Sequence, residues 1–437
     1  MVNKKYIKWL YEQLPEWLEQ GLIGPDQAEK LRTHYGETDD KPDYNIAFIV
    51  AGILGALLIG GGIVLIVAYN WEDFSKTTRT ILSFAPLIVA QIIFGYAYFQ
   101  KRDSIAWAES TSAFLMLMVA ASIALVSQTY HIWGDAESFL FIWLALSIPL
   151  MYLLNSSLVT IIYLIGIASW TMQIYDGESV WYWALLAAAL PHLFLNLRKQ
   201  NEPIRRNLLG WGLVLSFIFG WFGTIENNIA EYNFIGTALI FSLFYLLGQK
   251  LFTHSAFIYR PFQVFAVSGA FITLLFYTYA TFNFDASSFD AYAIVFGKRY
   301  EQWAGLINFT VLIIIALSFL FLFFQNFIQR KLSVHFIAFL PFFAAILLLI
   351  GRANQSGLVT VLANLFLLAW GIAYLVEGIR ERKMGWVNLG MLFILVLATA
   401  RFFDTDWSFV VKGVAFIILG AAFLTANWVL ARRLKSI

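Results

Sequence analysis

The residues best suited to chemistry stand in the stretch QTYHIWGD, which runs from Gln128 to Asp135. It places the titratable imidazole of His131 beside an amide, a phenol and a carboxylate. An imidazole that titrates near neutral pH could carry protons or bind a polar headgroup. The competing interpretation is an anchor at the membrane interface, where Tyr and Trp gather. The candidate substrate-binding residues here are Gln128, Tyr130, His131, Asp135 and Glu137.

A second candidate group of mixed charge stands near the end of the chain, at Arg401, Asp404, Asp406 and Lys412, and the first three of these are further candidate substrate-binding residues. Opposite charges beside a bilayer usually pair with each other, so local salt bridging is the competing interpretation. No residue is singled out as catalytic. The sequence holds 0 Cys, which removes thiolate ligands and nucleophiles, and it predicts neither a cofactor nor a metal site.

Acidic residues followed by Ser recur just before apolar runs, as in Asp135-Ala-Glu-Ser138 and Asp176-Gly-Glu-Ser179. Such side chains cap the free amides of a helix start and favour its positive dipole end, so we expect them to act as caps. The alternative is that several of these pairs converge on one outward-facing cavity that binds a cation or a metal-bridged phosphate.

The elements that must position these residues are membrane helices. The chain is 60% hydrophobic and 13% charged, whereas a soluble domain carries about 25% charged residues. A helix needs about 20 apolar residues to cross the hydrocarbon. Charge-free runs of that kind occur at 46–69, 80–99, 110–128, 138–175, 179–197, 207–225, 232–249, 261–284, 302–327, 332–351, 353–376, 384–400 and 413–431.

The run 138–175 would reach roughly 57 Å as one helix, nearly twice the hydrocarbon thickness. We expect a break at Asn155-Ser156-Ser157, which gives about 14 spans in total. With both termini in the cytosol, 22 of the 29 Lys and Arg residues fall inside, as the positive-inside rule requires. The predicted fold class is therefore an all-α polytopic transmembrane bundle of a bacterial inner membrane.

Residues 1–45 form the expected soluble part, a small cytosolic helical hairpin. Trp9, Leu14 and Trp17 recur at helical spacing, and Gly21 to Gly24 breaks the helix before Pro25 opens another. The transmembrane domain then covers 46–431, and a basic cytosolic tail covers 432–437. The hairpin is expected to lie on the membrane or to dock a protein partner.

Two patterns inside the spans bear on transport. The middle of each predicted span lacks Asp, Glu, Lys and Arg, which disfavours ion-coupled transport because such transporters keep charged groups there. His192 and Asn196 stand four residues apart on one helical face. We expect them to make an interhelical contact, with a proton relay as the weaker alternative.

Four segments resemble a family of bacterial predicted membrane proteins called domain of unknown function 2157. They are WLEQGLIGPDQAEKLRTHYG, YNWEDFSKTTR, SQTYHIWGDAESF and ATARFFDTDWSFVVKGVAFIILG. The resemblance covers the hairpin, the first four spans and the last two. It implies a multi-pass inner-membrane protein and supplies no catalytic residues.

Three functions remain open. The favoured one is transport or flipping of a lipidic or lipid-linked envelope molecule, because the spans are rich in aromatic residues and poor in charge. The second is an integral membrane enzyme acting on a polyprenyl-linked substrate. The third is a scaffold or regulatory protein. The expected partners are membrane lipids and a lipid-linked substrate, with no nucleic acid, since Lys and Arg form no basic stripe.

Overall fold

The computed structural model describes most of the chain. The described residues are 4–35, 69, 71–174, 177–199, 203–225, 230–252, 260–279, 299–328, 336–353, 355–404 and scattered positions between 410 and 425. Within them every regular element is a helix. The chain divides into two compact units, Met1–Lys76 and Thr77–Ile437.

The first unit contains the predicted helical pair. Helix α1 spans Lys4–Glu19 and α2 spans Pro25–Tyr35, and the two helices contact each other. Gly21 lies in the turn with a φ of 67°, a conformation that glycine adopts without strain. Leu14 and Ala28 are buried, and the Tyr11 hydroxyl donates to the Arg32 carbonyl at 3.3 Å. The two helices are confirmed, whereas their cytosolic location stays a prediction.

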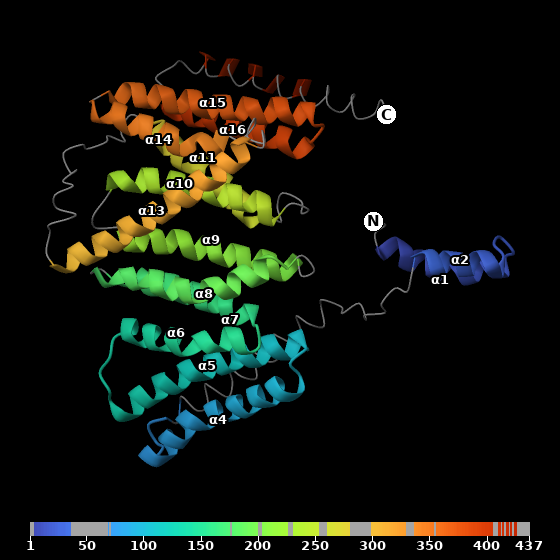
Figure 1. The fold of residues 1–437 in the computed structure, drawn as a ribbon, viewed down its shortest axis with the longest axis vertical. Coiled ribbons are helices and arrows are strands. Elements are labelled where there is room, and N and C mark those ends of the chain that lie inside the picture. Colours follow the sequence, from blue (N-terminus) through green and yellow to red (C-terminus); the bar gives the residue numbers. More distant parts are fainter. Residues whose placement is uncertain are drawn as a thin grey trace. The chain divides into compact units, whose positions relative to one another are not determined.

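The second unit is a series of helices that lie side by side in approximate chain order (Figure 1). They are α4 (Lys76–Gln100), α5 (Ile105–Tyr130), α6 (Ala136–Leu153), α7 (Ser157–Thr171), the short 3-10 helix η1 (Gly177–Val180), α8 (Trp181–Leu197), α9 (Pro203–Ile225), α10 (Ala230–Leu251), α11 (Pro261–Tyr277), α13 (Arg299–Ile328), α14 (Phe336–Arg352), α15 (Ser356–Arg380) and α16 (Met384–Asp404).

These helices follow the apolar runs of the sequence. Among the described residues, 8 helices are long and apolar enough to cross a membrane, and α7, α8, α11 and α14 are shorter apolar helices. The predicted break in the run 138–175 is confirmed, because α6 ends at Leu153 and α7 begins at Ser157. The runs 46–69 and 413–431 lie largely outside the described residues. The number of spans and their orientation therefore stay predictions.

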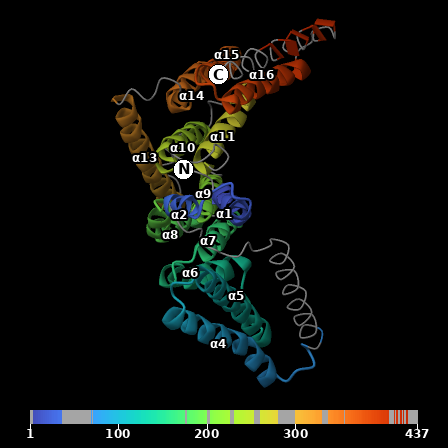
Figure 2. The ribbon, with the colours of Figure 1, turned by 90° about the vertical axis from the view of Figure 1, so that its right-hand side faces the viewer.

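Three groups of contacts hold the second unit together. Helix α7 packs against α6 and α9, and α10 packs against α11, α13 and α14, while α15 pairs with α16. Figure 2 shows α4, α5 and α6 at one end of this unit and α15 with α16 at the other. The buried aliphatic and aromatic residues of these helices form one continuous cluster from Ala90 to Leu397.

Candidate functional site

The predicted His131 site lies where α5 ends. His131 adopts the left-handed conformation with a φ of 50°, and its backbone N–H donates to the Ser127 carbonyl, which terminates the helix. The His131 side chain is exposed, as is that of Gln128. The Tyr130 hydroxyl lies 3.0 Å from Thr80 Oγ1 of α4 and so links the ends of two helices. The position of His131 thus has a structural use in ending α5.

Asp135 confirms the capping interpretation at the start of α6. Its carboxylate accepts the Ser138 backbone N–H at 2.6 Å. This hydrogen bond holds the pKa of the Asp135 carboxyl below its ordinary value of 3.8, because it favours the charged form. Between His131 and Asp135, Trp133 is 97% exposed. A large exposed indole beside a helix end is typical of an interfacial anchor.

The prediction that Ser179 caps the next helix is wrong at the start of α8. There η1 (Gly177–Val180) precedes the helix, and Val180 occupies the N-cap position without a side-chain cap. Ser179 is buried and does not cap α8. Asp176 lies outside the described residues.

The second candidate group has one residue with a described side chain, Arg401 on α16. Its guanidinium donates to the Thr278 carbonyl and to Thr278 Oγ1, both at 2.9 Å, at the end of α11. It also lies 4.4 Å from the Tyr279 ring centroid. Asp404 ends α16, but its side chain is outside the described part, and so is the whole of Asp406. Arg401 therefore joins α16 to α11.

Among the described residues, the structure does not bring His131 and Arg401 together. His131 follows α5, which packs on α6 and α7, whereas Arg401 belongs to α16, which packs on α15. The two views place α5 and α16 at opposite ends of the second unit (Figures 1 and 2). The substrate-binding role of either group stays a prediction.

A denser polar cluster lies near the start of α5, at the end opposite to His131, around Glu109. The Glu109 carboxylate accepts hydrogen bonds from Ser156 Oγ at 2.6 Å, from the Ser157 N–H at 2.9 Å and from the Leu158 N–H at 2.7 Å. These groups belong to the first turn of α7 and its N-cap. A carboxylate at this place satisfies free amides and favours the positive end of the helix dipole.

Arg205 of α9 forms an ion pair with Glu109. One of its terminal nitrogens lies 3.3 Å from Glu109 Oε1, and the two side chains are only 16% and 21% exposed. Arg205 also donates to Ser157 Oγ and to the Asn155 carbonyl. Asn155 has a φ of 52°, which turns the chain between α6 and α7 and presents this carbonyl. One ion pair therefore ties together the starts of α5, α7 and α9.

The cluster continues into the helices through His192 and Asn196 of α8. Thr160 Oγ1 donates to the Ser156 carbonyl at 2.8 Å and lies 3.0 Å from His192 Nδ1. Asn196 Nδ2 lies 3.1 Å from His192 Nε2 and donates to Asn155 Oδ1 at 2.8 Å. The predicted interhelical contact is thus confirmed, and it connects to a carboxylate that the sequence did not place near it.

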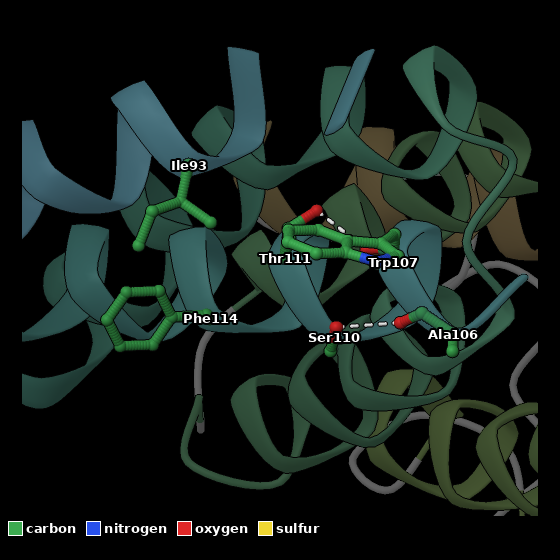
Figure 3. Close-up of a pocket in the computed structure, with 6 residues that line it drawn as sticks. All are labelled: Ile93, Ala106, Trp107, Ser110, Thr111 and Phe114. Atoms are coloured by element: carbon green, nitrogen blue, oxygen red, sulfur yellow. Dashed lines mark hydrogen bonds between the residues drawn. The ribbon is translucent and has the colours of Figure 1, made fainter. Parts of the chain in front are cut away.

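Two cavities adjoin the first turns of α5. One is polar, measures about 270 Å³ and is lined by Arg102, Asp103, Ile105, Ala108, Glu109, Tyr152, Leu153, Leu154, Asn155 and Arg205. The other is an apolar groove of about 320 Å³ between α4 and α5. Figure 3 shows the residues that line it, Ile93, Ala106, Trp107, Ser110, Thr111 and Phe114.

The two hydroxyls in the groove bond to their own helix. Ser110 Oγ donates to the Ala106 carbonyl at 2.6 Å, and Thr111 Oγ1 donates to the Trp107 carbonyl at 2.7 Å (Figure 3). Because these donors are used inside the helix, the groove presents mainly carbon to whatever enters it.

Sequence reasoning missed Glu109 and Arg205. Glu109 directly precedes the charge-free run 110–128, so the run places it outside the span, although α5 begins at Ile105. A signal was present: Glu109 stands amid Ala106, Trp107 and Ala108, which can form the first turn of an apolar helix. Among the described residues, no group of three or more His, Asp or Glu is arranged to hold a metal ion.

Comparison with known proteins supports the resemblance over part of the chain. The model of the family described as predicted membrane protein (DUF2157) matches residues 15–160. Three of the four segments that carry the resemblance lie in this range, together with Glu109 and most of the α4 to α7 region. No curated protein and no solved structure matches the chain.

Proposed function

We propose that this chain is an inner-membrane protein that transports or flips a lipidic or lipid-linked envelope molecule, which enters from the bilayer through the groove between α4 and α5. The groove is the observation that carries the proposal. Its volume of about 320 Å³ lies within the roughly 300–1,000 Å³ range of pockets that hold small organic ligands.

The position of the groove fits a ligand that arrives from lipid. Phe114 and Trp107 are each 38% exposed, and α4 and α5 are both apolar along a membrane-spanning length. Exposed apolar side chains on such helices face hydrocarbon. An acyl or prenyl chain can therefore reach the groove without crossing water.

The distribution of Lys and Arg predicts how the chain is oriented in the membrane. With both termini cytosolic, the starts of α5, α7 and α9 face the cytosol and the α5–α6 connection faces outward. Since the chain contains 0 Cys, single cysteines report sidedness cleanly. An impermeant maleimide should label Trp133→Cys in intact cells and Asp103→Cys only after permeabilisation. The reverse pattern would contradict this orientation.

A reconstitution assay tests the transport itself. The full chain is placed in phosphatidylcholine vesicles that contain a fluorescent phosphatidylglycerol or a fluorescent polyprenyl phosphate, and an impermeant reductant bleaches the outer leaflet. We expect the bleached fraction to exceed one half and to fall towards one half with Ser110→Phe, which fills the groove. Val361→Phe, at a 53% exposed site on α15, is the matched control and should leave transport unchanged.

Two results would contradict the proposal. One is bleaching of both probes that equals that of protein-free vesicles. The other is transport that Ser110→Phe and Val361→Phe reduce equally, since the groove would then have no special part. The enzyme and scaffold hypotheses stay predictions, and no contact described above favours either over transport.

A further inference from the structure

We propose that the polar cavity at the start of α5 is a binding site for an anionic, phosphate-type headgroup, and that Glu109 occupies the donors next to this cavity when no ligand is bound. The proposal deepens the transport function, on which it rests, by naming the polar part of the substrate. Three observations support it: the cavity itself, the two arginines that line it, and the hydrogen bonds that the Glu109 carboxylate accepts beside it.

The cavity is large enough and suitably lined for such a group. Its volume is about 270 Å³, and Arg102 and Arg205 both contribute to its wall. Arginine binds phosphate well, because the planar guanidinium group can donate two parallel N–H hydrogen bonds to two oxygens of the anion. Asn155 and Tyr152 add polar lining.

Glu109 lines the cavity, and the donors beside it at the start of α7 already bind an anionic group. Its carboxylate takes hydrogen bonds from Ser156 Oγ and from two backbone amides of α7, and it pairs with Arg205 at 3.3 Å. A phosphate oxygen requires the same donors and the same counter-charge. The side chain of Glu109 thus stands in for the ligand and competes with it.

The charged side chains of the cavity determine whether a substitution strengthens or weakens anion binding. Arg102 and Arg205 line the cavity together with Asp103 and Glu109, so two positive and two negative side chains offset each other. An incoming anion must displace Glu109 from Arg205 or bind beside it. Removing the charge of Glu109 should therefore strengthen anion binding, and removing a guanidinium should weaken it.

The cavity and the groove share the same two turns of α5. Ala106 and Trp107 line the groove, whereas Ile105, Ala108 and Glu109 line the polar cavity. At 100° per residue these two sets lie on different sides of the helix. A ligand with an anionic head and an apolar tail can therefore place its two parts around the beginning of α5.

Binding to the purified full chain tests the proposal. Native mass spectrometry compares retention of phosphatidylglycerol with that of phosphatidylcholine. We expect a preference for phosphatidylglycerol that Arg205→Gln and Arg102→Gln each lower about tenfold, equivalent to 1.4 kcal/mol, and that Glu109→Gln raises severalfold. Arg198→Gln removes the same charge from an exposed residue outside the cavity and should leave the preference unchanged.

Several outcomes decide the matter. Arg102 is exposed, so Arg102→Gln should leave the melting temperature unchanged and still lower binding, which keeps the test valid if Arg205→Gln fails to fold. The proposal is overturned if Glu109→Gln weakens binding, or if Arg198→Gln lowers it as much as Arg102→Gln does. Loss of transport with intact binding would contradict the proposed function alone.

A second experiment distinguishes free phosphate from a lipid headgroup as the ligand. Inorganic phosphate is added at millimolar concentration and the melting temperature is measured. A rise that is lost in Arg102→Gln supports a site open to free phosphate, whereas phosphatidylglycerol binding without such a rise supports a lipid headgroup. If neither probe binds, the proposal is wrong.

Discussion

Glu109 of α5 and Arg205 of α9 meet at 3.3 Å over the first turn of α7, and neither side chain is more than 21% exposed. The helices that contribute this pair are separated in the chain by α6, α7 and α8. Because the carboxylate also accepts two α7 amides, the pair fixes three helix starts at once. Removing this pair should therefore destabilise the packing of α5, α7 and α9 against one another.

The first prediction concerns that loss. Glu109→Ala leaves Arg205 and the α7 amides without their acceptor in a partly buried place. Breaking a fully buried pair costs about 3–5 kcal/mol, and with the exposure of this pair we expect about 2 kcal/mol. Thermal unfolding of the purified protein in detergent should show a clear fall in melting temperature.

The control for this change is an exposed ion pair. Glu381 lies 3.4 Å from Lys383, with the two side chains 44% and 53% exposed. Glu381→Ala should cost less than about 1 kcal/mol, because solvent already screens this pair. Equal effects of Glu109→Ala and Glu381→Ala would contradict a special role for the Glu109 pair.

The second prediction concerns the helix cap of α7. Ser156 is fully buried, accepts the Val159 N–H at 3.3 Å and donates to Glu109. Ser156→Ala should cost about 1 kcal/mol, as loss of a serine cap does. Ser104 occupies the same position before α5 but makes no side-chain cap. Ser104→Ala should therefore leave the unfolding temperature unchanged, and a loss equal to that of Ser156→Ala would refute the assignment.

The sequence predicted the helices of the second unit because each one needs a long apolar run to meet hydrocarbon. It also predicted the turn at Asn155 and the cap at Asp135, since both follow from local chemistry. It did not predict the meeting of Glu109 with Arg205. Those residues are 96 positions apart by their numbers, and their contact depends on how α7 packs against α5 and α9, which no local pattern encodes.

The third prediction concerns the close approach of α15 and α16. A Cβ added at Gly390 would lie 2.6 Å from the Gly371 carbonyl oxygen and 2.7 Å from the Leu375 backbone nitrogen. Backbone atoms cannot move aside as a side chain can, so Gly390→Ala should destabilise the pair by about 1–3 kcal/mol. Gly385, on the same helix, has nothing within 4 Å of such a Cβ. Gly385→Ala should be neutral or slightly stabilising in the same melting assay.

The last prediction concerns pH and Asp135. Its hydrogen bond from Ser138 lowers the pKa of the carboxyl below 3.8 in the folded protein, so the charged cap contributes stability above that pH and loses it as the pH falls through the lowered value. Asparagine caps a helix about as well as aspartate but does not titrate. The melting temperature of the unchanged protein should therefore fall more than that of Asp135→Asn between pH 7 and acid pH. Parallel curves for the two proteins would show that this carboxylate adds nothing to the start of α6.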